Sequence, residues 1–339
     1  MKERNYLFDN IKALMLLLVA IGHILDVYID DGNNTVFYIA MKYIYLFHMP
    51  VFAFVSGYFT KDFDRARNKA VKGVLIPYLI LQMGYVIVAA IMIYLGLAKF
   101  NAGVFNYSII LPSSAFYYLL ALFVWKLIAK DIMSLRCPLV ISTVLGLLIS
   151  FTKYDDFHMG YGAVFSLLIF YVLGIKCTES IINKIRKVPH VIAVFVLLLG
   201  LIPASVCPYS IHSIRLNYES EGFTNIEGML WRCLFYIVAI VMGMAIINLL
   251  PATKTFCSKI GMRAILVYGG STFLAPSGYV LICNLLHLDR NNMVNALGIL
   301  IFSILILFVC SSDIINNIYQ FIYNKIIGLL FKNTSQLEK

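Results

Sequence analysis

The sequence predicts an all-α fold, a polytopic integral membrane protein with about ten transmembrane helices. Hydrophobic residues occupy 61% of the 339 positions and charged residues 13%, against roughly 45–50% and about 25% in soluble globular chains. The mean hydropathy is +0.86. The apolar stretches are long and continuous, without the period-2 alternation of a membrane β-barrel. A bilayer is therefore the expected solvent of this chain.

Polar residues separate the apolar stretches and so define the predicted spans. The first stretch holds Lys12, Gly22, His23 and Asp26 and lacks a small-residue cleavage pattern. We therefore expect it to remain as a helix and not to be removed as a signal peptide. The fifth and sixth spans are short. The ten predicted spans are residues 11–29, 37–59, 73–96, 114–130, 138–152, 161–176, 190–206, 229–250, 264–283 and 294–313.

Basic residues predict the orientation, because they accumulate in cytoplasmic loops. With both termini in the cytosol, all but six of the 27 lysines and arginines fall in cytosolic segments. Attraction of these segments to anionic lipids explains the net charge of +10, so no nucleic-acid partner is expected. The seven cysteines show no C-x-x-C pair or metal-type spacing, so neither a disulfide framework nor a metal site is expected. The six exceptions are Lys42, Lys99, Lys153, Arg215, Arg232 and Arg290.

The first helix carries three polar side chains that the bilayer makes costly, so each is a candidate functional residue. Lys12 and His23 are eleven residues apart, which places them on one helix face, about 16 Å apart along the axis. Asp26 follows His23 at i+3, where its carboxylate can orient the imidazole ring. His23 is a candidate for proton transfer, and the alternative is a histidine that only packs or hydrogen-bonds.

The second helix carries His48 two residues before Pro50. Pro50 removes a backbone hydrogen bond and is expected to kink the helix and leave a carbonyl without its donor. Counted from the cytosolic edge at 1.5 Å per residue, His48 and His23 lie at similar depths, roughly 16 and 18 Å. His48 is therefore either a second site residue facing His23 or the partner of the freed carbonyl.

A cluster of cations follows the second helix: Arg65, Arg67, Lys69 and Lys72. Such a cluster at a membrane-embedded entrance suits the phosphates of a nucleotide-bearing donor. There is no Walker sequence or dinucleotide fingerprint, so a soluble nucleotide-binding fold is not indicated. The rule that places basic residues in the cytosol explains the cluster equally well.

These features coincide with a family pattern. Residues 8–12 (FDNIK) with Gly22 and His23 resemble the first helix of the membrane acyltransferase-3 family, and residues 47–52 (FHMPVF) with 56–59 (SGYF) resemble its second, notably in the fucose 4-O-acetylase-like branch. The chain departs from the family at several positions, and Tyr117 or Tyr118 stands where a tryptophan is usual. Lysines 69 and 72 stand near its usual arginines, and lysine lacks the bidentate fork of arginine. Ser271 stands about where a histidine is common.

The resemblance implies a membrane acyltransferase domain over residues 1–315, and residues 316–339 form a cytosolic tail with the spacing of an interfacial amphipathic helix. The donor implied is acyl-CoA, with acetyl-CoA as the expected form and no metal. His23 would be the general base, Asp26 would fix its tautomer, and His48 would orient the thioester or acceptor. Lys12, Arg65, Arg67, Lys69 and Lys72 would hold the donor. A covalent acyl-histidine relay remains an alternative to direct transfer.

The expected partners are acyl-CoA, a glycan or small-molecule acceptor and anionic lipids, with a homo-oligomer as a further option. The expected location is the plasma membrane. Two other classes remain open. A transporter or flippase of a polar metabolite or small amino acid would use the His/Asp group as proton relay or substrate site. A sensor or assembly partner of other envelope enzymes would need no chemistry, because a fold alone does not decide function.

Overall fold

The computed structural model describes residues 4–29, 35–94, 112–152, 160–207, 217–288 and 295–331, and all regular secondary structure within them is helical. The elements are α1 (Leu7–Ile29), α2 (Thr35–Tyr45), α3 (His48–Tyr58), α4 (Phe63–Asn68), η1 (Val71–Leu75), α5 (Ile76–Tyr94), η2 (Ser114–Phe116), α6 (Tyr117–Ser134), α7 (Pro138–Leu148), η3 (Ile149–Phe151), α8 (Tyr161–Ser166), α9 (Leu168–Lys176), α10 (Glu179–Arg186), α11 (His190–Leu199), α12 (Leu201–Val206), α13 (Asn225–Leu249), α14 (Ser258–Met262), α15 (Ala264–Leu285), α16 (Asn295–Cys310) and α17 (Asp313–Leu330).

Several of these helices can cross a membrane, which confirms the predicted all-α membrane class. Among the described residues, five helical segments are long and apolar enough, and the number rises to seven if each of two bent helix pairs is one span. Two shorter apolar helices cover Pro138–Phe151 and His190–Val206. The fourth predicted span corresponds to α6, which carries Lys126, Lys130 and Asp131 and lies outside this set. The total of ten spans stays a prediction.

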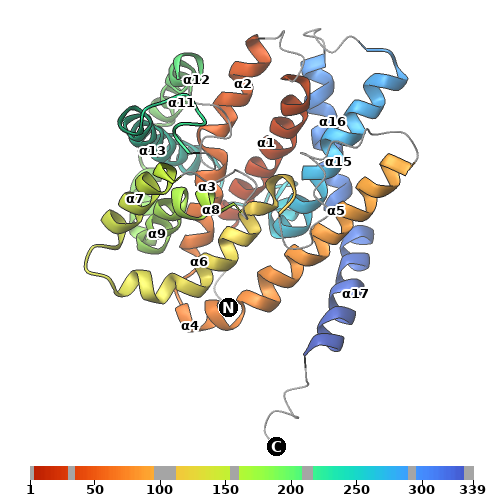
Figure 1. The fold of residues 1–339 in the computed structure, drawn as a ribbon, viewed down its shortest axis with the longest axis horizontal. Coiled ribbons are helices and arrows are strands. Elements are labelled where there is room, and N and C mark those ends of the chain that lie inside the picture. The colour runs from red at the N-terminus through yellow and green to blue at the C-terminus, as the bar shows by residue number, and fades with distance from the viewer. Residues whose placement is uncertain are drawn as a thin grey trace, which may run out of the picture.

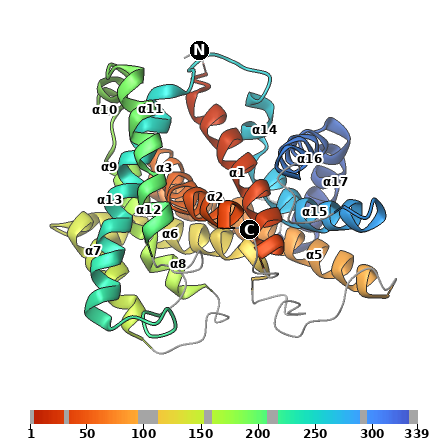
Figure 2. The ribbon, with the colours of Figure 1, turned by 90° about the horizontal axis from the view of Figure 1, so that it is seen from above.

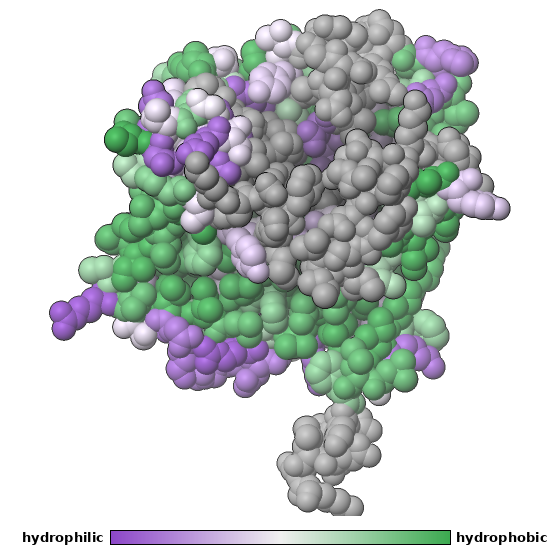
Figure 3. All heavy atoms as spheres, viewed as in Figure 1, coloured by the Kyte–Doolittle hydropathy of each residue, from purple (hydrophilic) through white to green (hydrophobic). Residues whose placement is uncertain are grey.

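The distribution of hydrophobic side chains on the surface also fits a membrane protein. Figure 3 shows a broad band of hydrophobic side chains across the molecule, with hydrophilic side chains gathered along its lower edge, where α4 lies in Figure 1. A band of this kind is what a bilayer requires of a protein that faces lipid tails. The structure contains no bilayer, so the assignment of the lower edge to the cytosol stays a prediction.

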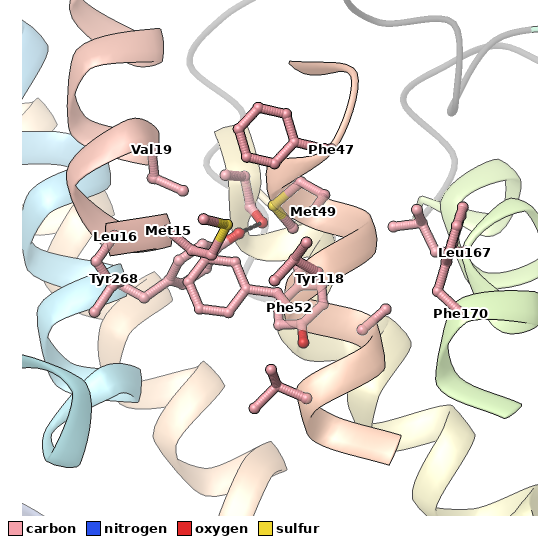
Figure 4. Close-up of a cluster of buried hydrophobic side chains, with 14 of the residues drawn as sticks. Met15, Leu16, Val19, Phe47, Met49, Phe52, Tyr118, Leu167, Phe170 and Tyr268 are labelled. Atoms are coloured by element: carbon pink, nitrogen blue, oxygen red, sulfur yellow. Dashed lines mark hydrogen bonds between the residues drawn. The ribbon is translucent and has the colours of Figure 1, made fainter. Parts of the chain in front are cut away.

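Helix α1 lies at the centre of the bundle and packs against α2, α3, α14, α15 and α16. In the view of Figure 2, helices α7 to α13 lie on one side of α1, and α5 with α14 to α17 on the other. The core between them is aromatic and aliphatic. Figure 4 shows Met15, Leu16 and Val19 of α1 with Phe52 of α3, Tyr118 of α6 and Tyr268 of α15.

Helices α3 and α9 approach each other closely because two glycines face the partner backbone. A Cβ added at Gly57 would lie 1.9 Å from the carbonyl oxygen of Tyr171, and one added at Gly174 would lie 2.0 Å from that of Phe54. Small residues at a crossing allow this backbone contact between membrane helices. The contact fixes α3, which carries His48, against a second helix.

The segments predicted to be cytosolic meet at one end of the bundle. The Asn10 side chain donates to the carbonyls of Pro251 and Thr253, and Arg186 donates to the carbonyl of Leu250. Lys61 donates to three carbonyls at and just after the end of α9, those of Gly174, Ile175 and Cys177. We call this end the basic face, defined by residues 4–12, 59–72, 127–131, 174–187, 247–263 and 311–313. The predicted grouping of these segments therefore matches the structure.

Candidate functional site

The break between α2 and α3 shapes the first group of candidate residues. The second predicted span is two helices, separated at Leu46 and Phe47, and Pro50 lies in the first turn of α3. A proline there needs no donor, but its ring excludes the carbonyl of the residue four positions earlier, which explains why the helix is interrupted just before His48. The expected kink is present, and it takes the form of a complete break.

The His48 ring satisfies one of the carbonyls at this break. Its Nδ1 lies 2.8 Å from the carbonyl oxygen of Ile44, and His48 is buried, with 4% of its surface exposed. A carbonyl can only accept, so Nδ1 carries the proton of this hydrogen bond. In the neutral ring Nε2 then holds a lone pair. The ring therefore bonds a carbonyl beside the break, and this tautomer leaves Nε2 chemically able to accept a proton or a hydrogen bond.

Tyr45, the last residue of α2, links the break to the first helix. Its ring centroid lies 4.8 Å from that of His48, at an interplanar angle of 66°. A Cβ added at Gly22, the neighbour of His23, would lie 3.0 Å from Cε2 of Tyr45. One ring therefore contacts His48 and the turn of α1 that carries His23. Sequence reasoning missed Tyr45, although its spacing of three residues from His48 was a usable indication.

Helix α1 carries the other candidates of this group. Lys12, His23 and Asp26 lie on one uninterrupted helix, as predicted, and all three are partly buried. The predicted catalytic roles of His23 and Asp26 stay predictions. The direct approach of the two histidines to a shared polar cavity also stays a prediction.

At the basic face, Lys12 forms an ion pair that sequence reasoning did not identify. Its Nζ lies 2.9 Å from Asp9, and the guanidinium of Arg4 lies 2.8 Å from the other carboxylate oxygen. The Asp9 side chain is 6% exposed, against 22% for Lys12 and 53% for Arg4. The spacing of Asp9 and Lys12, three residues apart on a helix, could have revealed the pair. A donor phosphate that binds Lys12 must compete with this carboxylate.

The four predicted phosphate-binding cations differ in their contacts, and their role in binding phosphate stays a prediction. Arg67 pairs with Asp131 of α6 at 2.6 Å and donates to the carbonyl of Leu127. The Nζ of Lys72 lies 4.5 Å above the ring of Phe331. Arg65 and Lys69 are exposed, and their side chains make no ion pair with any residue that the structure describes. These two are therefore the cations best placed to meet a ligand from solution.

A second link joins α4 to α6 beside Arg67. Lys130 lies 2.8 Å from Asp64, and its hydrogen bond holds the pKa of that carboxyl below its ordinary value. Both side chains are more than half exposed, so the link is weak. The cation cluster thus rests on a short helix held mainly by charges.

The end of the bundle opposite the basic face contains a buried arginine that sequence reasoning did not select. Arg232 of α13 is 1% exposed and donates to the hydroxyls of Ser150 and Ser166. Its guanidinium lies 5.6 Å from the centre of the Tyr218 ring. Ser271, at the position where the family commonly has a histidine, is fully buried, and its hydroxyl lies 3.4 Å from the carbonyl oxygen of Tyr268.

The described part of the chain contains no group of side chains arranged to bind a metal ion. Across those ranges, no group of three or more His, Cys, Asp or Glu side chains is close enough to hold an ion. The polar side chains that do meet are imidazole, hydroxyl, carboxylate and ammonium groups. Such groups suit proton transfer and the binding of anions.

The architecture and the buried histidine define a helical membrane protein with groups suited to acid–base chemistry. A family model described as an acyltransferase domain matches residues 5–213, more than half of the chain. This chain belongs to the acyltransferase-3 family. The match includes His23, Asp26, His48, Lys12 and the four predicted donor-binding cations between Arg65 and Lys72, whereas α13 to α17 lie beyond it.

Two curated relatives match a shorter part of the chain. They are the nodulation proteins NolL of Sinorhizobium fredii and Mesorhizobium japonicum, each 34% identical over 85 residues. The match covers 23% of this chain and 23% or 22% of the relatives. The aligned part thus spans less than a quarter of the length of either relative. No solved structure matches this chain.

Proposed function

We propose that this protein is a multi-pass plasma-membrane O-acyltransferase. It transfers an acyl group, with acetyl as the expected form, from cytosolic acyl-CoA to a hydroxyl of an envelope glycan or another extracytoplasmic acceptor. The observation that supports this most is the acyltransferase family match, which covers every candidate residue from Lys12 to Lys72. The buried His48, with its tautomer set by Ile44, adds a polar group prepared for chemistry inside the bundle.

In the proposed reaction, His23 passes one proton from the acceptor hydroxyl to the leaving thiolate. His23 accepts the proton of the acceptor hydroxyl as that oxygen attacks the thioester carbonyl. The carbon–sulfur bond then breaks, and the leaving thiolate takes the proton from the imidazolium. The products are an ester and free coenzyme A. In the relay alternative, an acyl-histidine forms first and the acceptor hydroxyl attacks it in a second step.

His48 and the cations have binding roles in this proposal. Nε2 of His48 orients the thioester or the acceptor by accepting a hydrogen bond, and Tyr45 keeps the His48 ring close to the first helix. The polar arm and phosphates of the donor are bound by cations, since phosphates favour charged donors: Lys12, Arg65, Arg67, Lys69 and Lys72. Anionic lipids compete for the same cations, because both ligands are attracted by the same positive charge.

The experiment is a thiol-release assay on purified protein in lipid nanodiscs, with acetyl-CoA and a set of glycan acceptors. We expect stoichiometric release of coenzyme A that depends on an acceptor. His23→Ala should lower the rate by about two to four orders of magnitude, the range for a positioned acid–base group. His287→Asn is the control, because His287 is exposed with φ 51° and asparagine tolerates that conformation.

The opposite result would replace the proposal. Uptake of a polar solute into proteoliposomes, without any consumption of donor, would identify a transporter in which His23 and Asp26 bind or relay protons. Wild-type turnover by His23→Ala would remove the general-base role from that residue.

A further inference from the structure

The start of α5 contains an irregularity that leaves one backbone carbonyl without a helical donor. Residues Val71–Leu75 form a π-helix, in which the amide of Ile76 donates to the carbonyl of Val71. The next carbonyl, that of Lys72, would take its donor from residue 77 in the same pattern. Residue 77 is a proline and has no N–H. Single-turn π-helices of this kind often occur at functional sites.

A residue from the far end of the chain supplies the missing donor. The hydroxyl of Tyr323 in α17 donates to the carbonyl oxygen of Lys72 at 3.0 Å, across 251 positions of sequence. The side chain of the same lysine is also engaged by this region, because its Nζ lies 4.5 Å from the centre of the Phe331 ring. The backbone and the ammonium of Lys72 are thus both held by the C-terminal helix and the residue that follows it.

Helix α17 is itself anchored at its first residue. Asp313 pairs with Lys259 at 2.8 Å and with Arg263 at 2.6 Å, and α17 turns by 50° from α16. In Figure 1 it descends past α5 toward the edge where α4 lies. The face turned away from the bundle is apolar and exposed, with Ile314, Ile318, Phe321, Leu329 and Leu330 each more than half exposed.

We propose that Tyr323 and Phe331 are positioning residues for Lys72, and that α17 is the strap that holds this lysine at the entrance for the donor. This inference rests on the proposed function, because it gives Lys72 a donor phosphate as its ligand. Tyr323 fixes the π-helical backbone, so the ammonium points consistently. Phe331 occupies the ammonium while no phosphate is bound, and a phosphate displaces the ring because a full negative charge attracts an ammonium more strongly.

The chain provides a matched pair of variants. Tyr323→Phe removes only the hydroxyl that donates to Lys72. Tyr319→Phe removes a hydroxyl from the neighbouring turn, where the ring stacks with that of Tyr323 at 6.2 Å. With the full-length protein in nanodiscs, Tyr323→Phe should raise the amide exchange rate of residues 71–76 and the Kd for coenzyme A by about threefold to tenfold each, which is the range for one hydrogen bond. Tyr319→Phe should leave both unchanged.

A second substitution tests the cause of the missing donor. Pro77→Ala restores an amide that can serve the carbonyl of Lys72, so Tyr323→Phe in that background should change exchange and Kd by less than about twofold. Faster exchange in Tyr323→Phe with an unchanged Kd would overturn the positioning role and leave a structural contact only. Unchanged exchange and unchanged Kd would overturn the strap.

The two proposals fail in different ways. If the wild type binds coenzyme A and transfers no acyl group, the proposed function fails, whereas the effect of Tyr323→Phe on Kd still supports the positioning of Lys72. If acyl transfer is normal while Tyr323→Phe and Phe331→Leu both keep the wild-type Kd, the positioning role fails and the acyltransferase stands.

Discussion

Pro50 and Pro77 each lie beside an irregular helical turn, and the side-chain hydrogen bonds to a nearby carbonyl differ between the two places. Beside Pro50 the side-chain hydrogen bond is local, since the His48 ring donates to the carbonyl of Ile44, four residues earlier. Beside Pro77, the donor is Tyr323, which lies in the last helix. The first hydrogen bond is buried and lies within one candidate span, Thr35–Tyr58. The second is exposed and depends on a tertiary contact.

The surroundings of the two prolines also differ: the helix beside Pro50 is closely packed, and the helix beside Pro77 is open. Helix α3 contacts the backbone of α9 through Gly57 and Gly174, whereas Gly73 and Gly84, on η1 and α5, have open space where a Cβ would lie. Backbone contact restricts movement, and open surface permits it. A rigid element suits a group that must meet a reacting atom, and an adjustable element suits a group that must admit a ligand.

The largest expected effect separates the two possible roles of His48. Asparagine can place an N–H near the position of Nδ1, and glutamine can place a polar group near Nε2. If Nε2 meets substrate, His48→Asn should lose about two to three orders of magnitude in turnover while it keeps most of its stability, because the hydrogen bond to Ile44 is retained. Turnover and thermal unfolding of both variants, measured on monodisperse protein, decide the question.

A purely structural role for His48 predicts the opposite results for the two variants. If His48 only hydrogen-bonds the carbonyl of Ile44, His48→Asn keeps its activity. His48→Gln then loses stability because the buried hydrogen bond from the ring is lost and only the amide of Phe47 still donates to that carbonyl. The break beside Pro50 would then have a structural role only.

Glycine substitutions test the difference in rigidity. Gly174→Ala places a Cβ 2.0 Å from the carbonyl oxygen of Phe54, so the backbones of α3 and α9 must separate, at a cost of about 1–3 kcal/mol or more. Gly84→Ala meets no atom within 4 Å and should stabilise α5 by up to about 1 kcal/mol through helix propensity. Thermal unfolding in nanodiscs compares the two. Equal midpoints would show that the α3–α9 contact is not a rigid support.

The sequence predicted much of this architecture, because composition and long apolar stretches report directly on a bilayer. It also predicted the grouping of the basic segments and the disruption beside Pro50. Both depend on local rules, namely the placement of basic residues in cytosolic loops and the missing N–H of proline.

What the sequence did not reveal depends on partners far along the chain. Lys72 and Phe331, Arg67 and Asp131, and Arg232 with its two serines meet only in three dimensions. Charge alone grouped two lysines and two arginines as one predicted site, although the contacts of these four side chains differ: Arg67 forms an ion pair and Lys72 lies over a ring. Asp9 was within reach of local reasoning, because it lies one turn before Lys12 on the same helix.

Lys12 gives the third prediction, which concerns donor affinity at the basic face. Lys12→Met should raise the KM for acyl-CoA by about tenfold, whereas Lys12→Arg keeps the charge and most of the affinity. Arg4→Met is the control, because Arg4 is the more exposed partner of the same carboxylate. It should lower stability slightly and leave the KM unchanged. An equal rise in KM for both variants would mean that Asp9, and not the Lys12 charge, determines binding.

The smallest expected effect concerns the exposed ion pairs that hold α4. The hydrogen bond from Lys130 lowers the pKa of the Asp64 carboxyl below its ordinary value. A carboxyl whose folded pKa is depressed stabilises the fold above its unfolded pKa, and this contribution is lost as the pH falls through the folded pKa. Asp64→Asn should therefore lower the unfolding midpoint by less than about 2 °C at pH 7. The difference from the wild type should disappear near pH 3, and also in about 1 M salt, which screens exposed pairs. A difference that persisted at low pH would mean that Asp64 supports α4 through its packing and not through its charge. The basic face would then be as rigid as the α3–α9 contact, and the contrast between the two proline breaks would lose its mechanical basis.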